Sequence, residues 1–172
     1  MGIIIYKKEG DAYHEDMIEV YSMSTWKPSL LQFIPPGLPG KYVFWWLMHY
    51  FSIFKNKNYS AVIAKDNSKI VGIIVLSPAY FRWKFMNNND LQITNVFVNS
   101  DYRGKGIAYQ MINHAIKNFS LTGRVFWYIT TQDNIPSMKL SKKAGFQLAG
   151  KGLKINKTGI KGLSEIKLVE GV

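Results

Sequence analysis

One stretch of the chain, residues 96–108, has the residue types needed to hold a phosphate group. An apolar, β-branched segment leads through a short polar turn into a basic, glycine-containing helix start. A helix leaves its first four N–H groups without internal acceptors and carries a partial positive charge at that end, so the backbone alone can hold an anion there. Gly104 and Gly106 have no Cβ, which lets a phosphate approach the main chain closely. The stretch predicts a phosphate-binding helix N-terminus, although a basic glycine turn also occurs as a plain connector.

A second pattern with fixed spacing lies downstream, over residues 134–146. Asn134 is followed three residues later by Ser137 and eleven residues later by Gly145-Phe146. An apolar segment expected to form a strand separates the two patterns. Two motifs in a fixed order, with the expected elements between them, are much harder to obtain by chance than either motif alone.

Together the two patterns resemble the motifs of the GCN5-related N-acetyltransferase (GNAT) family. The spacing Arg-x-x-Gly-x-Ala, from Arg103 to Ala108, resembles the acetyl-coenzyme A signature of that family, and the second pattern resembles its closing motif. The resemblance covers residues 60–146 well and the N-terminal third only loosely. It implies that residues 1–172 form a single GNAT domain that uses acetyl-coenzyme A (acetyl-CoA) as co-substrate and no metal.

The resemblance also implies which residues hold acetyl-CoA. The N–H groups from about Tyr102 to Ala108 would hold the pyrophosphate, the preceding strand would present backbone groups to the pantetheine arm, and Asn134 would bond to that arm. The Arg103 side chain is either a phosphate contact or a solvated charge. The cofactor-binding residues expected in this way are Val96, Phe97, Val98, Arg103, Gly104, Lys105, Gly106, Ile107, Ala108 and Asn134.

The reaction implied is attack by an acceptor amine on the acetyl thioester, which needs a group to take the amine proton and an acid for the departing thiolate. Where many members of the family have a glutamate this chain has Gln92, which cannot be a base. Where many have a tyrosine it has Ser141, which is a poor acid. These two residues and Tyr128 are the catalytic candidates. Catalysis would then depend on positioning and a water relay, with Asp90, Tyr128 or His49 as possible participants.

The acceptor stays open at this stage. It could be a small amine, an amino sugar, an antibiotic or a protein amine, and the missing tyrosine together with Ser137 and Lys143 also resembles the branch that modifies protein N-termini. The alternative to an enzyme is a non-catalytic member of the same fold that binds acyl-CoA as a sensor or partner module, because fold alone does not establish activity.

The segment 41–54 is apolar nearly all round and includes five consecutive large side chains after Val43. It is too short to span a bilayer as a helix, which needs about twenty residues. It predicts a buried helix, a wall for an apolar acceptor, an interfacial membrane contact or a homodimer face. Its His49 and Tyr50, with Tyr80 further on, are the substrate-binding candidates. The family resemblance implies that the Pro- and Gly-rich loop 30–40 borders the acceptor site.

The net charge of +11 and the pI near 9.7 favour an anionic partner. Residues 139–172 contain eight lysines and two glutamates. Acetyl-CoA satisfies this requirement, whereas nucleic acid is disfavoured because the aromatic residues lie in strands and one apolar helix rather than between the lysines. The chain has no cysteine, and its three histidines do not form a metal-binding set, so disulfides, thiol nucleophiles and a metal site are not expected. The N-terminal apolar run is too short for a signal peptide, which makes a cytoplasmic protein the expectation.

Hydrophobic periodicity predicts the elements that must position these residues. Strands are expected over 3–6, 59–65, 69–76, 91–98, 125–129, 146–148, 151–157 and 163–169, and helices over 11–23, 41–54, 104–119 and just after Asn134. The fold class implied is α/β (α+β), the GNAT fold. It has a mixed, mostly antiparallel twisted sheet of six to seven strands, about four flanking helices, and a V-shaped splay between the fourth and fifth strands.

Overall fold

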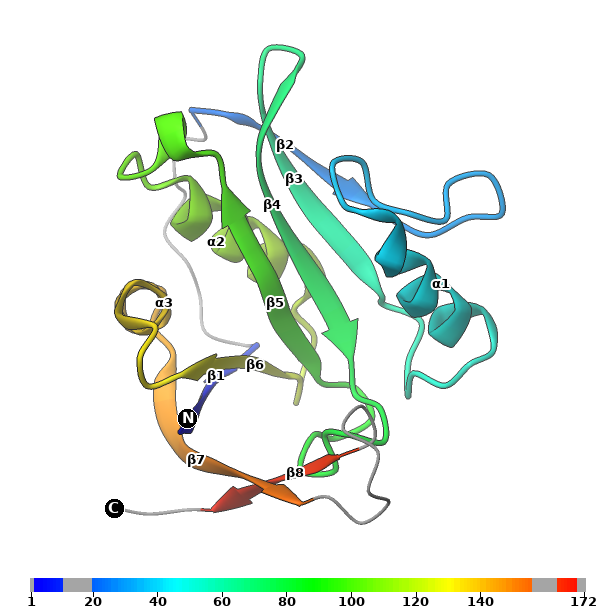
Figure 1. Ribbon diagram of the computed structural model, residues 1–172, viewed down its shortest axis with the longest axis vertical. Coiled ribbons are helices and arrows are strands. Elements are labelled where there is room, and N and C mark those ends of the chain that lie inside the picture. Colours follow the sequence, from blue (N-terminus) through cyan, green and yellow to red (C-terminus); the bar gives the residue numbers. More distant parts are fainter. Residues whose placement is uncertain (1, 11–19, 156–163, 170–172) are drawn as a thin grey trace.

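The computed structural model describes residues 2–10, 20–155 and 164–169, and a single curved sheet runs through all of them (Figure 1). The strands are β1 (Ile3–Glu9), β2 (Ser22–Trp26), β3 (Ser60–Asp66), β4 (Lys69–Pro78), β5 (Leu91–Val98), β6 (Val125–Thr131), β7 (Gln147–Ile155) and β8 (Glu165–Val169). The helices are α1 (Val43–Tyr50), α2 (Ile107–Phe119) and α3 (Ile135–Lys143), with short 3₁₀ turns η1 (Gly40–Tyr42) and η2 (Ser100–Tyr102). The strand order is β2-β3-β4-β5-β6-β1-β7-β8.

The sheet is antiparallel except at one place near its centre. There β5 and β6 run parallel, and they pair over only three positions, from Leu91 opposite Phe126 to Ile93 opposite Tyr128. Every other neighbouring pair is antiparallel. The predicted mixed, mostly antiparallel sheet is confirmed, with eight strands rather than six to seven. The fourth and fifth strands of the prediction, residues 91–98 and 125–129, correspond to β5 and β6, and their short ladder is where the splay was expected.

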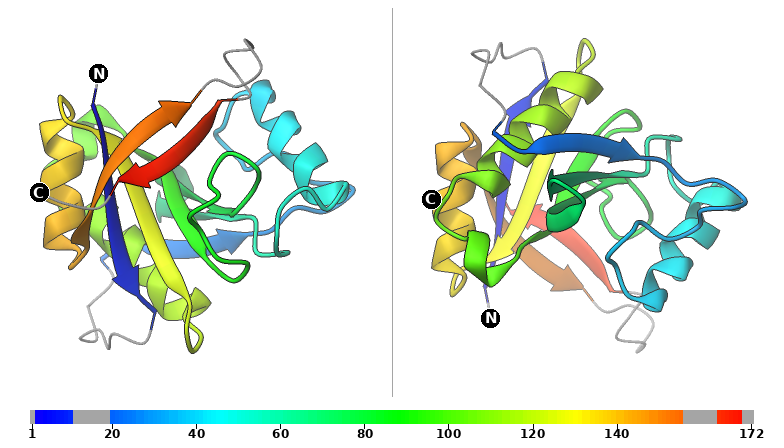
Figure 2. Two further views of the ribbon diagram at one scale, coloured as in Figure 1. Left: turned by 90° about the horizontal axis from the view of Figure 1, so that it is seen from below. Right: turned by 90° about the horizontal axis from the view of Figure 1, so that it is seen from above.

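The helices cover both faces of the sheet (Figure 2). On one face α2 and α3 pack on a core that includes Ile74, Leu91 and Met111. On the other face α1 packs with its Met48 on a second core, which also takes up Ile166 of β8. Burial of apolar area on both faces is the main stabilising contribution to such a three-layered arrangement.

The position of α2 depends on the small residue in β4. A Cβ placed on Gly72 would lie 2.9 Å from Met111 Cε and 3.2 Å from Ile107 Cγ2. Both contacts are closer than side chains normally allow, so glycine lets the first turns of α2 approach the sheet closely. The helix N-terminus is therefore held at a fixed height above β4 and β5.

Three expectations about the elements need correction. Residues 22–26 form an edge strand where a helix over 11–23 was expected to end, and the rest of that predicted helix lies outside the described residues. Gln147–Ile155 is one strand rather than two, because Gly150 takes a φ of +151° and shifts the register with β1 without ending the ladder. The third correction concerns the predicted helix 41–54, since α1 spans eight residues only.

The helix α1 is also only half-buried. Its Met48 is 1% exposed, whereas Phe44 is 58% and Tyr50 57% exposed. The expectation of a helix buried all round therefore holds for one face only, and the other face presents apolar rings to solvent.

Candidate functional site

The site is built around an irregularity in β5. Ile73 of β4 pairs with Phe97, but Val75 pairs with Thr94, so β5 has an extra residue between these positions. Asn95 lies in this bulge with a φ of +50°, a backbone conformation that asparagine tolerates better than most residues. Because the pairing with β6 ends at Ile93, the edge of β5 beyond the bulge has no strand beside it.

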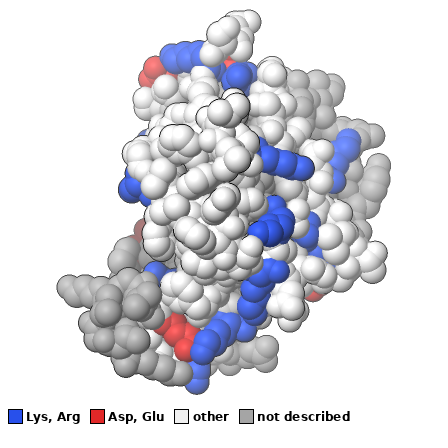
Figure 3. All heavy atoms as spheres, turned by 90° about the vertical axis from the view of Figure 1, so that its right-hand side faces the viewer, with Lys and Arg blue, Asp and Glu red and all other residues white. Residues whose placement is uncertain are grey.

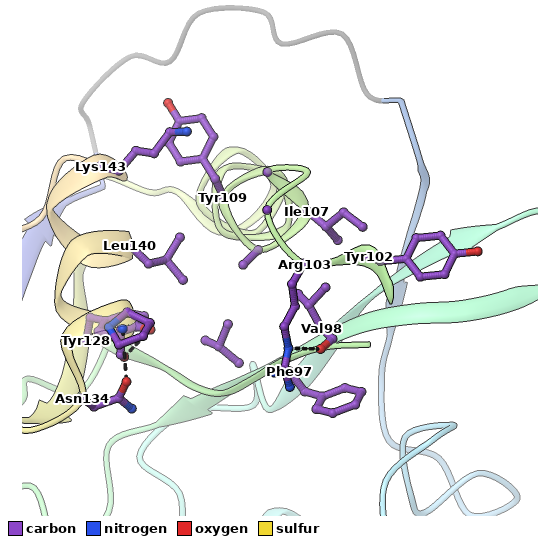
Figure 4. A pocket seen from close by; sticks show the side chains of 16 residues that line it. Phe97, Val98, Tyr102, Arg103, Ile107, Tyr109, Tyr128, Asn134, Leu140 and Lys143 are labelled. Carbon is purple, nitrogen blue, oxygen red and sulfur yellow. Dashed lines mark hydrogen bonds between the residues drawn. The ribbon is translucent and has the colours of Figure 1, made fainter. Parts of the chain in front are cut away.

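A cavity of about 600 Å³ opens where β5 and β6 separate (Figure 4). Side chains of β5 and the following loop lie on one side, those of α3 on the other, and the first turn of α2 lies across the top. The lining residues are Val96, Phe97, Val98, Tyr102, Arg103, Gly104, Gly106, Ile107, Ala108, Tyr109, Tyr128, Asn134, Pro136, Ser137, Leu140 and Lys143. Nine of the ten residues expected to bind the cofactor are among them, and Lys105 is not.

The turn before α2 leaves backbone donors directed at this cavity. Gly104 and Gly106 have φ values of +79° and +77°, which favour glycine. A Cβ at Gly104 would meet nothing within 4 Å, and one at Gly106 only the Gln110 side chain at 4.0 Å, so both glycines border open space. The Gln110 N–H is the first to donate within the helix, to Gly106 O at 3.0 Å. The N–H groups just before it have no acceptor in the helix, which is the condition for binding an anion.

The charges around this first cavity are positive. Arg103 Nε donates to Val98 O at 3.2 Å, which fixes the guanidinium along β5, and Lys143 Nζ lies 5.1 Å from the centre of the Tyr109 ring. None of the described residues that line the cavity is acidic. Lys105 instead places its ammonium 4.8 Å from the Tyr102 ring centre, so only its backbone is available to a ligand here.

The α3 side of the cavity provides a hydroxyl and an amide. Asn134 caps α3, because its Oδ1 accepts the Ser137 N–H at 3.2 Å, and its amide nitrogen is left for other partners. Tyr128 and Ser137 share a hydrogen bond of 2.8 Å between their hydroxyl oxygens. Burial raises the pKa of the Tyr128 phenol above its ordinary value, so the group stays protonated at neutral pH.

Two candidates for proton transfer have structural contacts instead. Ser141 is fully buried, lies outside both cavities described here, and donates its hydroxyl to Met138 O at 2.9 Å. The carboxylate of Asp90, also fully buried, accepts from Trp127 Nε1 at 2.8 Å and from the Asn87 N–H at 2.8 Å. Ser141 therefore bonds within α3, whereas Asp90 ties the start of β5 to β6 and to the loop before it.

A second cavity, of about 310 Å³, is also bordered by β5. Residues 92, 94 and 95 of the strand line the second cavity and residues 96–98 line the first, so the bulge lies between the parts of β5 that border the two cavities. The second cavity is lined by Lys41, Tyr42, Trp45, Ser77, Tyr80, Arg82, Trp83, Gln92, Thr94 and Asn95. Gln92 and Tyr80, expected in different roles, therefore border the same space.

The remaining substrate candidates lie elsewhere. His49 and Tyr50 line neither cavity, and Tyr50 stacks on Trp46 with ring centres 5.4 Å apart. The His49 ring lies 6.1 Å from that of Tyr59, and burial, with a contribution from the Lys57 charge, lowers the pKa of His49. The structure thus brings Tyr80 to a cavity and leaves these two on the α1 side.

Sequence reasoning overlooked much of the lining. Ser137, Leu140 and Lys143 follow Asn134 at intervals of three residues, and this spacing places them along one side of α3. That periodicity was a usable signal. No sequence pattern predicted the second cavity, because its residues come from η1, α1, β4, β5 and the loop between β4 and β5.

In the described part of the chain there is no cluster of three or more His, Cys, Asp or Glu side chains suited to a metal. The same residues include no helix that is long and apolar enough to cross a membrane.

The comparisons with known proteins agree with this geometry. The model of the acetyltransferase (GNAT) family matches residues 20–146. The chain therefore belongs to the GNAT family of acetyltransferases, and the family and fold class predicted from the two motifs are confirmed. Members of this family use acetyl-CoA, and the cationic first cavity with its open glycine turn suits the phosphates of that molecule.

Three solved structures are similar in fold. They are a GNAT-family acetyltransferase from Colwellia psychrerythraea, a GCN5-related N-acetyltransferase from Sphaerobacter thermophilus, and a tandem GNAT protein from the clavulanic acid biosynthesis pathway. Sequence identities are 16%, 16% and 13%, and TM-scores are 0.55, 0.56 and 0.57. Each match covers 86% of this chain but only 53%, 48% and 50% of the other, so the chain spans about half the length of these proteins. No curated protein sequence matches the chain.

Proposed function

We propose that the chain transfers the acetyl group of acetyl-CoA to a primary amine by direct attack within a ternary complex. The observation that supports this is that consecutive residues at the β5 bulge line two cavities, Val96 the first and Asn95 the second. A thioester at the end of the first cavity and an amine in the second would be adjacent. Holding two reactants side by side in this way supplies a large part of the catalysis in such transfers.

In this proposal the first cavity binds acetyl-CoA. The N–H groups of residues 104–108 hold the pyrophosphate, with Arg103 and Lys143 as the cations beside it. The edge of β5 beyond Ile93 is free of β6 and bonds the amides of the pantetheine arm. The amide nitrogen of Asn134 donates to the same arm from the other side of the cleft.

The described lining of the second cavity offers no base. It contains no carboxylate and no histidine, and Gln92 is neutral. The amine therefore loses its proton to water as its nitrogen bonds to the acetyl carbon and the bond from that carbon to sulfur breaks. Gln92 and Thr94 contribute by orienting the amine or that water.

The departing thiolate takes its proton from Tyr128. This phenol lines the first cavity, shares a hydrogen bond of 2.8 Å with Ser137, and carries its proton at neutral pH. Water then restores the proton on the phenol. Ser141 has no part in this step, because its hydroxyl is buried away from the cavity.

A second candidate function has its own support. The missing carboxylate and the buried Ser141 also suit a domain that binds acyl-CoA without catalysing transfer. The two are separated by measuring thiol release from acetyl-CoA over a panel of amines, together with calorimetry of CoA binding. Thiol release that depends on an amine supports the enzyme, and tight binding with no release on any amine supports the binding module.

A further inference from the structure

The second cavity is lined by positive charge. Its two charged lining residues among those described, Lys41 and Arg82, are both cationic. The face of the molecule that carries α1 has many more Lys and Arg than Asp and Glu side chains in view (Figure 3). Resting on the proposed function, we propose that the acceptor is a small molecule that carries a carboxylate as well as its amine, and that Arg82 binds this carboxylate.

The surroundings of Arg82 support its role as an anion receptor. Its Nε atom is buried and has no hydrogen-bond partner among the described residues. Glu165, in the strand beside this loop, has an ion pair with Lys84 at 3.1 Å, and no described acidic side chain is paired with Arg82. Arg82 lines the cavity without an acidic partner among the described residues, so a ligand carboxylate can bind its guanidinium there through charge-assisted hydrogen bonds.

Arg82 is also held in position before any ligand arrives. Its guanidinium carbon lies 5.3 Å from the centre of the Trp83 ring, a cation–π arrangement that orients the planar group. Its carbonyl oxygen accepts the Ile166 N–H at 3.0 Å, which ties this loop to β8. A planar guanidinium held against a ring, on a loop whose backbone is anchored, binds the planar carboxylate better than a mobile ammonium does.

The remaining lining fits the rest of such a molecule. Four aromatic rings, those of Tyr42, Trp45, Tyr80 and Trp83, border the cavity and provide apolar contact for a carbon skeleton. The two cations also act on the amine, because nearby positive charge lowers its pKa and increases the neutral fraction that can attack. The same charge repels polycationic amines, so selection works by repulsion as well as attraction.

The test uses matched pairs of amines, each an amino carboxylate and its primary carboxamide, which differ only in charge. The pairs include aromatic and aliphatic skeletons and cover increasing distances between the amine and the carboxylate. Thiol release gives kcat/KM for each member. We expect at least one pair in which the carboxylate is favoured by about tenfold or more, and we expect Arg82→Gln to remove that preference while the amide is still acetylated. The exposed Lys41→Gln should reduce it partially, and Lys154→Gln, an exposed position on β7 outside both cavities, should leave it unchanged.

Two outcomes would overturn the proposed carboxylate recognition without contradicting the proposed acetyltransferase activity. One is a preference for amides or polyamines across all pairs, and the other is a carboxylate preference that Arg82→Gln does not alter. If no amine releases thiol, the proposed function fails, and calorimetry of the same pairs with CoA present still tests the cavity. Carboxylate binding that Arg82→Gln abolishes supports the anion receptor, and equal or absent binding of both members rejects it.

Discussion

The two cavities differ in what they are made of. The first is formed largely by backbone, at a glycine turn, a helix N-terminus and a strand edge that has lost its neighbour. The second is formed by side chains from five separate elements, with rings and two cations as its main features. A backbone site suits a ligand that every member of a family shares, whereas a side-chain site can change from one chain to the next. In the proposed function, the cofactor common to the family therefore binds in the first cavity and the second cavity selects the acceptor.

The largest effect should follow from filling the first cavity. Gly106→Glu places a long acidic side chain where the phosphates would lie, and we expect CoA affinity to fall by at least about 100-fold, or about 2.7 kcal/mol. Calorimetry with CoA measures this directly.

Gly123→Glu is the matched control for that change. Gly123 has a φ of +75°, and a Cβ added there would meet nothing within 4 Å, which is close to the situation at Gly106. It lies in the turn before β6 and lines neither cavity. Both variants introduce the same charge and the same backbone strain, about 1–2 kcal/mol for a non-glycine residue in this conformation. Equal CoA affinities for the two folded variants would show that this turn does not bind the phosphates.

Tyr128→Phe should act on chemistry rather than on binding. Without its hydroxyl the thiolate must leave unprotonated, and we expect kcat to fall by about 10- to 100-fold with the KM for acetyl-CoA changed by less than about threefold. Steady-state kinetics with saturating amine separates the two constants. An unchanged kcat would mean that the phenol is not the acid.

Ser141→Ala should have a much smaller effect on turnover. The Ser141 hydroxyl bonds within α3 and lines neither cavity, so we expect kcat within about tenfold of the wild type and a stability loss of about 1 kcal/mol from the lost hydrogen bond. A thousandfold slower enzyme with normal cofactor affinity would show that Ser141 takes part in catalysis and that Tyr128 does not suffice.

These comparisons also show how far a sequence can be read. The residues around Gly104 and Gly106 were predictable because a helix N-terminus and its glycines are contiguous in the chain and their physics is local. The short β5–β6 ladder was implied only through the family resemblance. The edge strand Ser22–Trp26 was missed because its pairing with β3 is a tertiary preference that the local apolar spacing does not contain.

The second cavity could not be predicted for the same physical reason. Lys41 and Arg82 are forty-one positions apart, and only the fold brings them to one space. Neither lysine nor arginine in a loop is distinguishable in sequence from a solvated surface charge. His49 and Tyr50 were proposed from the aromatic segment they belong to, but that segment contributes its earlier residues, including Trp45, to the cavity instead.

Asn134 caps α3, and variants can separate this role from its proposed contact with the pantetheine arm. Asn134→Ala removes the α3 cap and should cost about 1 kcal/mol of unfolding free energy in addition to weakening CoA binding. Asn134→Asp keeps an acceptor for the Ser137 N–H but loses the amide donor, so we expect nearly normal stability and weaker CoA binding. Thermal unfolding and calorimetry on both variants test this. Normal CoA affinity in Asn134→Asp would show that Asn134 caps α3 but does not bind the pantetheine arm through its amide.

The smallest effect concerns pH on the α1 side. Because burial lowers the pKa of His49 below that of the unfolded chain, the unfolded state binds the proton more readily. The contribution to stability is complete above about pH 6.5 and decreases as pH falls from there towards the folded pKa. Denaturant unfolding at pH 7.5 and pH 5.5 should show a smaller loss for His49→Gln than for the wild type. An identical loss would assign the acid sensitivity to other groups.

The central claim is that acetyl-CoA occupies the first cavity and ends at the β5 bulge. Amide chemical-shift mapping of the 19.7 kDa protein during titration with CoA tests it most directly. We expect the largest changes at residues 104–108 and 95–98, with smaller ones at Asn134 and Ser137 and none along β8. Changes concentrated at Lys41, Trp45 and Arg82, with the glycine turn unaffected, would contradict the assignment of the two cavities.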